Sequence, residues 1–125
     1  SRVKSEDTDI EKLLRSELHK RGLRFRKNVA NLPGKPDIVF PGVRILVFVD
    51  GDFWHGYRFL QWKNSLPVFW KNKIQKNIER DKLNTMQLRK MHWRVIRVWG
   101  HNVENNIEKT MTKIINAHNK YNNQN

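Results

Sequence analysis

The sequence predicts a three-layer α/β domain, in which a mixed β-sheet is flanked by helices. Three observations predict it. The elements follow one another as helix, strand, hairpin, helix, strand and helix. The run from Arg44 to Val49 is apolar on both faces beyond Arg44, so its strand needs cover on both sides. The chain has 125 residues, which is the size of one domain that can fold alone.

Residues 8–21 predict the first helix. Thr8 and Glu11 form a capping box at its start. Gly22 supplies a residue that can end it. One apolar stripe at helical spacing consists of Ile10, Leu13, Leu14 and Leu18.

The next elements are short and β-rich. Residues 23–26 alternate between apolar and basic side chains, which predicts a half-buried strand, and residues 31–34 predict a loop. Residues 37–40 and 44–49 predict a hairpin with its turn at Pro41-Gly42. Val43, Ile45, Val47 and Val49 should then face one side of the sheet, and Arg44, Leu46 and Phe48 the other.

The second half of the chain predicts two longer helices around one strand. Residues 50–64 predict a loop, 68–91 a helix, 94–99 a strand and 103–121 a final helix. We expect residues 1–125 to form a single domain, with flexible ends at 1–7 and 120–125.

The charge indicates a polyanionic partner. Lys and Arg number 25 against 12 Asp and Glu, which gives a net charge of +13, and the isoelectric point is near 10.4. The absence of cysteine excludes disulfides and zinc sites built on thiolates. The longest apolar run, Ile45–Val49, is too short to span a membrane, and no signal peptide is visible. We therefore expect a cytoplasmic protein without a membrane partner or a small-molecule ligand.

Two carboxylates should meet at the open end of the predicted hairpin. Asp37 opens one strand and Asp50 closes the next, so the turn at Pro41-Gly42 brings them side by side. Oxygen ligands at such a place suit Mg²⁺, which can polarise a phosphodiester and orient a water molecule. Alternatively, Asp37 merely begins a strand, and Asp50-Gly51-Asp52 forms a turn.

Two further groups lie within reach of these acids. His55 is placed in the loop that should overhang this end of the sheet, where an imidazole can act as general acid or base. Glu11 can serve as an accessory acid, although its role in the capping box explains it equally well. Asp52 is a further candidate ligand.

Aromatic and basic residues are dense around this segment, as expected of a surface that stacks on bases and holds phosphates. For Trp70 the alternative is packing inside the domain. The predicted DNA-binding residues are Phe53, Trp54, Trp70, Lys35, Arg58, Lys63, Lys71 and Lys73.

Four segments together carry a family resemblance. They are Leu32-Pro-Gly-Lys-Pro-Asp37, Val47-Phe-Val-Asp-Gly51 followed by Phe53-Trp-His-Gly56, Phe69-Trp70 with Asn77-Ile-Glu-Arg-Asp81, and Trp93-Arg-Val with Val98-Trp99. In order and spacing over residues 6–100, they resemble the very short patch repair (Vsr) DNA mismatch endonucleases.

The resemblance implies a restriction-endonuclease-like fold of the PD-(D/E)xK superfamily. It implies Mg²⁺-dependent hydrolysis of one strand of double-stranded DNA, 5′ to the thymine of a T:G mismatch, in a bacterial cytoplasm. By position, Asp37 and the main-chain carbonyl of Val49 match the family's metal contacts. His55 and Glu11 match residues of its active site. Phe53, Trp54 and Trp70 match aromatics that enter the DNA stack.

The chain also departs from the family. Well-studied members carry a structural zinc, but here Asp52 and Tyr57 replace its ligands and cysteine is absent, so we expect no zinc and a loop held by packing. Asp50 replaces a histidine and is a candidate direct ligand for one or two Mg²⁺ ions. Asp52 stands where the superfamily has its lysine, for which Lys35 and Lys73 are candidate substitutes.

Three functions remain open from the sequence. The first is a Mg²⁺-dependent endonuclease that nicks one strand at a T:G or other mismatch. The second is a restriction-type enzyme that cuts paired duplex DNA. The third is a basic DNA-binding module with a decayed active site.

Overall fold

The computed structural model describes residues 8–27 and 29–124, with side chains through residue 120. Its elements are α1 (Asp9–Lys20), β1 (Arg26–Lys27), β2 (Ile38–Phe40), the 3₁₀ turn η1 (Pro41–Val43), β3 (Ile45–Asp50), α2 (Phe59–Trp62), the 3₁₀ turn η2 (Lys63–Ser65), α3 (Val68–Lys90), β4 (Arg94–Trp99), α4 (Gly100–Asn105) and α5 (Ile107–Gln124).

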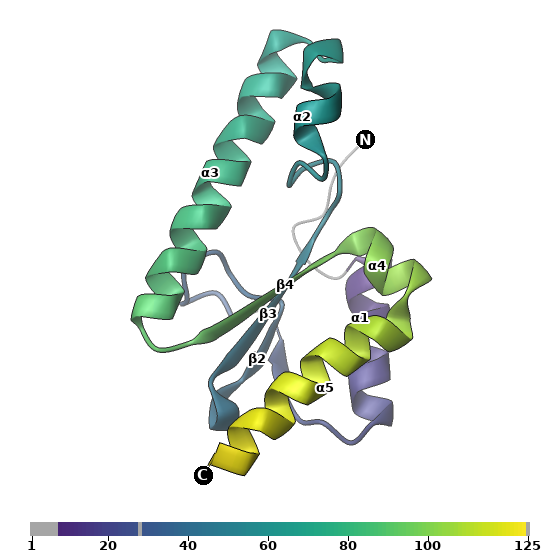
Figure 1. Cartoon of the computed structure of the whole chain (residues 1–125), viewed down its shortest axis with the longest axis vertical. Helices are drawn as coiled ribbons and strands as arrows, with labels where there is room; N and C mark the ends of the chain where they lie inside the picture. Colours follow the sequence, from purple (N-terminus) through teal and green to yellow (C-terminus); the bar gives the residue numbers. More distant parts are fainter. Residues whose placement is uncertain (1–7, 28, 125) are drawn as a thin grey trace.

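These elements form the predicted three layers. The sheet has the order β1-β2-β3-β4. The first three strands are antiparallel neighbours, and β4 runs parallel to β3 after the crossover through α3, so the sheet is mixed. In Figure 1, α3 lies on one side of the sheet and α1, α4 and α5 lie on the other. The expected restriction-endonuclease-like arrangement is therefore confirmed.

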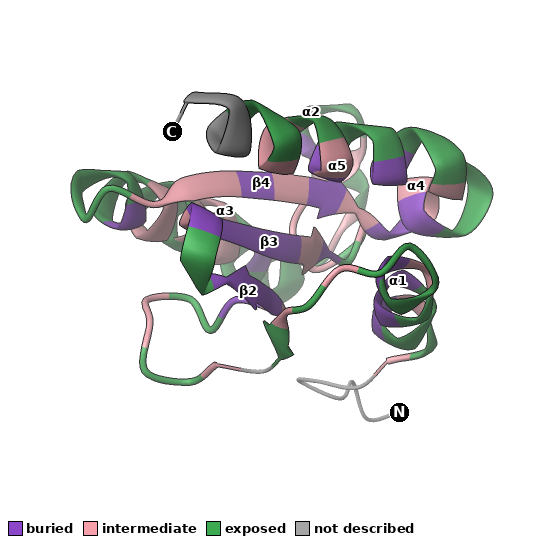
Figure 2. Cartoon of the chain, turned by 90° about the horizontal axis from the view of Figure 1, so that it is seen from below, coloured by how far each residue is buried: buried purple, intermediate pink, exposed green. Residues whose placement is uncertain are grey.

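The predicted division of β3 into two apolar faces is confirmed. Ile45 and Val47 are fully buried in a core shared with α1, α4 and α5. Leu46 and Phe48 are buried in a smaller core against α3 and Leu88. Figure 2 shows β3 as a largely buried strand inside the sheet. A strand covered on both sides holds its last residue, Asp50, in a fixed position.

Three element boundaries differ from the sequence prediction. The first strand is only Arg26–Lys27, because Phe25 turns to stack on His19 (ring centroids 4.6 Å apart) and approaches Phe40. The segment 50–64 contains the short helix α2. The final helix is two helices, α4 and α5, with a break at Asn106, whose φ of −138° is not helical.

The remaining elements agree with the sequence. Thr8 caps α1 with a hydrogen bond from the Glu11 N–H to its side chain, and α3 covers Val68–Lys90. The hairpin turn is η1, with Arg44 in the left-handed region at φ 55°. The expected flexibility of the ends is untested, because residues 1–7 and 125 lie outside the described residues and α5 continues to Gln124. Among the described residues, no helix is long and apolar enough to cross a bilayer.

The loop after β3 is packed tightly onto α3. The Asn77 side chain donates a hydrogen bond to the carbonyl of Trp54 at 3.0 Å. Gly56 has a φ of +75°, and a Cβ at this position would lie 2.5 Å from the Ile78 side chain. Glycine suits this position because of its positive φ and the lack of room for a side chain. The close contact holds the loop that carries His55 against α3.

Candidate active site

A cavity of about 340 Å³ opens at the end of the sheet where Asp37 and Asp50 lie. It is lined by α1, the loop before β2, the end of β3 and the loop that follows. Four of the predicted site residues, Glu11, Asp37, Asp50 and His55, line it together, and so do Val49, Lys35 and Trp54. The hairpin therefore brings the two aspartates to one cavity.

Asp37 joins the two strands at the floor of the cavity. Its N–H donates to the carbonyl of Val47 at 3.1 Å, and its Oδ2 accepts a hydrogen bond from the Val49 N–H at 2.7 Å. Burial raises the pKa of Asp37 to about 7; the Val49 bond opposes this rise, and the nearby Glu11 and Asp50 add to it. Burial and its acidic neighbours therefore disfavour the charged form of Asp37, which a bound cation would favour.

Glu11 lines the cavity and also takes part in the capping box. Its Oε2 accepts a 2.7 Å hydrogen bond from the Thr8 hydroxyl, which completes the capping box. Its Oε1 is buried and has no hydrogen-bond partner among the described residues. Glu11 also contributes to the raised pKa of Asp37, so the two carboxyl groups lie close to each other.

These two acids fit a hard divalent cation. A buried carboxylate oxygen without a partner is costly, and a second carboxylate beside it increases the cost. Mg²⁺ binds through one or two carboxylates and keeps several water molecules. Glu11 and Asp37 supply that donor set at the wall of a cavity.

His55 is paired with an acid that sequence reasoning missed. Its Nδ1 lies 2.6 Å from Oδ2 of Asp81 in α3 and 3.6 Å from Oδ1 of Asp50. Burial lowers the pKa of His55, but the Asp81 hydrogen bond and the charge of Asp50 outweigh it, so the pKa is raised. Because the Asp81 carboxylate accepts at Nδ1, the ring proton resides there and Nε2 is the basic nitrogen.

The negative charge of the Asp50 carboxylate is balanced by an arginine. The Arg97 Nη1 of β4 donates to Asp50 Oδ1 at 2.8 Å. Burial raises the pKa of Asp50, and the positive charge of Arg97 is the largest influence that opposes the rise. Asp50, His55 and Asp81 also place one donor atom each within 4.8 Å of one another, a spacing that suits a metal ion. The guanidinium already holds one of those donors, Asp50 Oδ1.

Asp52 lies apart from the cavity. Its Oδ2 is 2.9 Å from Nδ1 of His101 in α4, and its Oδ1 accepts from the His101 N–H at 3.4 Å. The ring of Tyr57 packs on His101 and on Trp99, at 4.4 and 5.1 Å between centroids. This group joins the loop after β3 to α4 by hydrogen bonds and by packing, and Asp52 does not line the cavity.

The predicted aromatics form one cluster beside the cavity. Trp54 contacts Phe53 and Trp70, with ring centroids 5.0 and 5.3 Å apart, and Phe53 stacks on Trp62 at 5.6 Å. Phe53 is 43% exposed and Trp70 37%. Neighbouring apolar side chains that are more exposed still are Leu60, Val68 and Phe69. Both structure and exposure therefore favour a surface role for Trp70 over packing in the core.

The predicted cations lie around this cluster at different distances from the cavity. Lys35 lines the cavity, with its backbone in the left-handed region at φ 54°. The Lys73 Nζ lies over the rings of Trp54 and Trp70, 5.5 and 5.8 Å from their centroids, and it does not line the cavity. Arg58 lies against Tyr57, and Lys63 and Lys71 are half-buried in η2 and α3.

Comparisons with known proteins point to one family. The family model described as DNA mismatch endonuclease Vsr matches residues 1–61. The type II nicking enzyme V.XorIIP of Xanthomonas oryzae pv. oryzae is 46% identical over 99 residues, which cover 78% of this chain and 73% of that protein. The type II nicking enzyme V.HpaIIP of Haemophilus parainfluenzae is 38% identical over 91% of this chain and 83% of its own length.

The DNA mismatch endonuclease Vsr of Escherichia coli is 41% identical over 78% of this chain and 64% of its own length. The residues matched by the family model include α1, β2, β3 and the loop after β3. The chain belongs to the Vsr family and is a DNA endonuclease.

Proposed function

We propose that this protein is a Mg²⁺-dependent endonuclease that nicks one strand of duplex DNA at a T:G or other mismatch. The observation that carries the proposal is that one cavity is lined by the Asp37 and Glu11 carboxylates and by His55, whose ring is hydrogen-bonded to Asp81. The first group suits a cation and the second suits proton transfer, and hydrolysis of a phosphodiester needs both.

The cation side consists of Asp37 and Glu11, with the main-chain carbonyl of Val49 as the third candidate contact. When bound, Mg²⁺ polarises the phosphate and stabilises charge on the leaving oxygen. Asp50 retains a place beside the cavity, but Arg97 already binds its Oδ1, so we assign Asp50 to holding His55 and not to direct ligation. Lys35 at the cavity wall supplies a positive charge beside the phosphate.

The proton-transfer side consists of His55 and Asp81. Asp81 accepts at Nδ1 and leaves Nε2 to take a proton from the attacking water. Asp81 also stabilises the imidazolium that forms, because its carboxylate lies 2.6 Å from that ring. His55 is therefore the general base of the proposed reaction, and Asp81 orients it.

Recognition of a mismatch is supported by the aromatic cluster. The first turns of α3 and the helix α2 project beyond the sheet (Figure 1). They carry the largely exposed side chains of Phe69 and Leu60 and the partly exposed ring of Trp70. Apolar wedges of this kind enter base steps that are weakly stacked, and unstacking costs least at a mismatch. The net charge of +13 supplies the phosphate contacts.

The expected cellular location of this protein follows from its proposed substrate. The compared relatives come from bacteria, and the one from Escherichia coli is named a DNA mismatch endonuclease. We place this chain in the bacterial cytoplasm, with double-stranded DNA as its partner.

The test is cleavage of duplexes labelled at both 5′ ends, each carrying one mismatch, with the fully paired duplex as control. We expect one product from one strand of the T:G duplex, formed with Mg²⁺ and absent with a chelator. Equal cleavage of both strands of the paired duplex would instead identify a restriction-type enzyme. Salt-sensitive binding without any Mg²⁺-stimulated product would identify a DNA-binding module without activity.

A further inference from the structure

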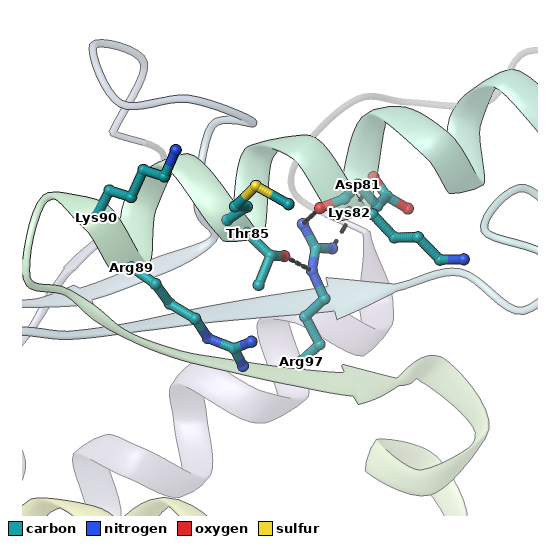
Figure 3. A pocket seen from close by; sticks show the side chains of 7 residues that line it. Asp81, Lys82, Thr85, Arg89, Lys90 and Arg97 are labelled. Carbon is teal, nitrogen blue, oxygen red and sulfur yellow. Dashed lines mark hydrogen bonds and ion pairs between the residues drawn. The ribbon is translucent and has the colours of Figure 1, made fainter.

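The Arg97 side chain makes several contacts behind the site. Figure 3 shows it reaching from β4 to α3, where its Nε donates to the Thr85 hydroxyl at 2.9 Å. Its Nη1 donates to Asp50 Oδ1 at 2.8 Å and lies 4.0 Å from Asp81 Oδ1. The guanidinium also lies flat over the Phe48 ring, 4.1 Å from its centroid. These contacts fix both its position and its plane.

The acids that Arg97 contacts are the ones that support His55. Asp50 is 3.6 Å and Asp81 2.6 Å from the Nδ1 of His55. Without Arg97, two carboxylates would face one imidazole nitrogen in a partly buried place, which is a donor set that binds divalent ions. A guanidinium against Asp50 Oδ1 leaves no acceptable place for a doubly charged ion next to it, because the two cations would repel each other.

We propose that Arg97 is a positioning residue that acts as a built-in cation for Asp50, His55 and Asp81, so that a divalent ion binds only on the Asp37 and Glu11 side. The inference deepens the proposed nuclease function and rests on it for its catalytic consequence. Without the guanidinium, an ion would compete for His55 Nδ1 and Asp81 Oδ2, whose hydrogen bond orients the imidazole ring. The general base would then be misplaced.

Arginine suits this position better than lysine. Its fork reaches Thr85 through Nε and Asp50 through Nη1 at the same time, whereas an ammonium is a single point charge on a flexible stem. An Arg97→Lys variant should therefore restore the charge but only part of the orientation.

The first readout is the single-turnover rate of nicking of the T:G duplex at saturating Mg²⁺. We expect Arg97→Met to lower this rate by about 100-fold, since it misplaces the general base, and Arg97→Lys by about 10-fold. The affinity for the same duplex, measured in Ca²⁺, should change by less than about threefold, because Arg97 acts on the chemical step. Arg94→Met is the matched control: Arg94 is on the same strand and its side chain donates to the carbonyl of Ala117 in α5.

The second readout is the number of Mn²⁺ ions bound to the DNA-free protein, followed by electron paramagnetic resonance. We expect one ion on the wild-type protein and on Arg97→Lys, and a second ion on Arg97→Met that disappears when Asp81→Asn is added. If circular dichroism shows that the Met variant does not fold, Arg97→Gln, which keeps a hydrogen-bond donor for Asp50, gives the same comparison.

Either of two results would overturn the inference. One is nicking by the uncharged variant at the wild-type rate. The other is an equal Mn²⁺ count on the wild-type and uncharged proteins. Failure of the wild-type protein to nick any duplex would instead contradict the proposed function, and the Mn²⁺ count would still decide whether Arg97 excludes an ion.

Discussion

Two groups of acidic side chains meet at the same end of this sheet, and they differ in how their charge is balanced. Asp50 and Asp81 have cationic partners within the protein, Arg97 and His55. Among the described residues, Asp37 accepts from the Val49 N–H and Glu11 from the Thr8 hydroxyl, the two carboxyl groups lie close to each other, and one oxygen of Glu11 has no hydrogen-bond partner. From this difference we predict that the first group is balanced without a ligand, whereas the second binds an external cation.

The sharpest way to test this difference is to neutralise one acid in each group. Asp37→Asn removes the charge that holds the cation, so nicking of the T:G duplex should fall at least about 1,000-fold. Binding to the same duplex should persist, because the aromatic cluster and the basic surface are untouched. Gel-shift titration measures binding and end-labelled cleavage measures the rate. Wild-type cleavage by a folded Asp37→Asn protein would contradict the assignment.

Asp81→Asn acts on the balanced group and should have a smaller effect. It leaves His55 without the carboxylate that orients its ring, so the rate should fall by about 100-fold or more at saturating DNA. The hydrogen bond to Asp81 helps to raise the pKa of His55, so the midpoint of the rise in rate with pH should move to lower pH. Glu79→Gln, an exposed acid on the same helix, is the control and should match the wild type.

The two groups should also respond oppositely in stability. The pKa of Asp37 is raised from 3.8 to about 7, so the folded form binds the proton more tightly than the unfolded form. The resulting stability is present below pH 4 and is lost as pH rises to about 7. In a chelator at pH 8, Asp37→Asn should therefore raise the free energy of unfolding by on the order of 2 kcal/mol.

Asp81→Asn should lower stability, and more so at pH 5, where the His55 ring is protonated, because it removes a partly buried pair with that ring. Urea titration at pH 5 and at pH 8 measures both effects, with the exposed Glu104→Gln as control. If Asp37→Asn were less stable than the wild type at pH 8, the view of Asp37 as an unbalanced acid would fail.

The smallest effect is expected for Asp52, which belongs to neither group. Its carboxylate pairs with His101 at 2.9 Å, and this pair is partly exposed, so Asp52→Asn should cost about 1 kcal/mol of stability or less. The nicking rate at 25 °C should stay within about threefold of the wild-type rate. A drop as large as that of Asp37→Asn would return Asp52 to the list of metal ligands.

Much of the fold could be predicted because local patterns determine it. The capping box at Thr8, the turn after Phe40 and the alternation along β3 each depend on neighbours in sequence. The meeting of Asp37 and Asp50 followed from the hairpin alone. The break at Asn106 was missed because the apolar stripe of α5 continues smoothly from α4, and only the backbone angles separate them.

The partners of the site residues could not be predicted in the same way. Asp81 lies 26 positions after His55 in the sequence. It shares a helix face with Ile78 and Leu88, and these apolar neighbours indicate a face directed to the core. Arg97 lies 47 positions after Asp50 and alternates with buried residues of β4. Asp81 and Arg97 are each a charged residue on an otherwise mostly apolar face, which is a signal that a sequence search could use. Which charged side chains form pairs depends on how the helix and the strands pack together.

The most direct test of the account is the position of a bound ion in a crystal of this protein soaked with Mn²⁺, located from its anomalous scattering. The account predicts one peak at about 2.0–2.3 Å from a carboxylate oxygen of Asp37, with Glu11 beside it. It also predicts that Arg97 remains bonded to Asp50. A peak between His55 and Asp81, with the floor of the cavity empty, would contradict it.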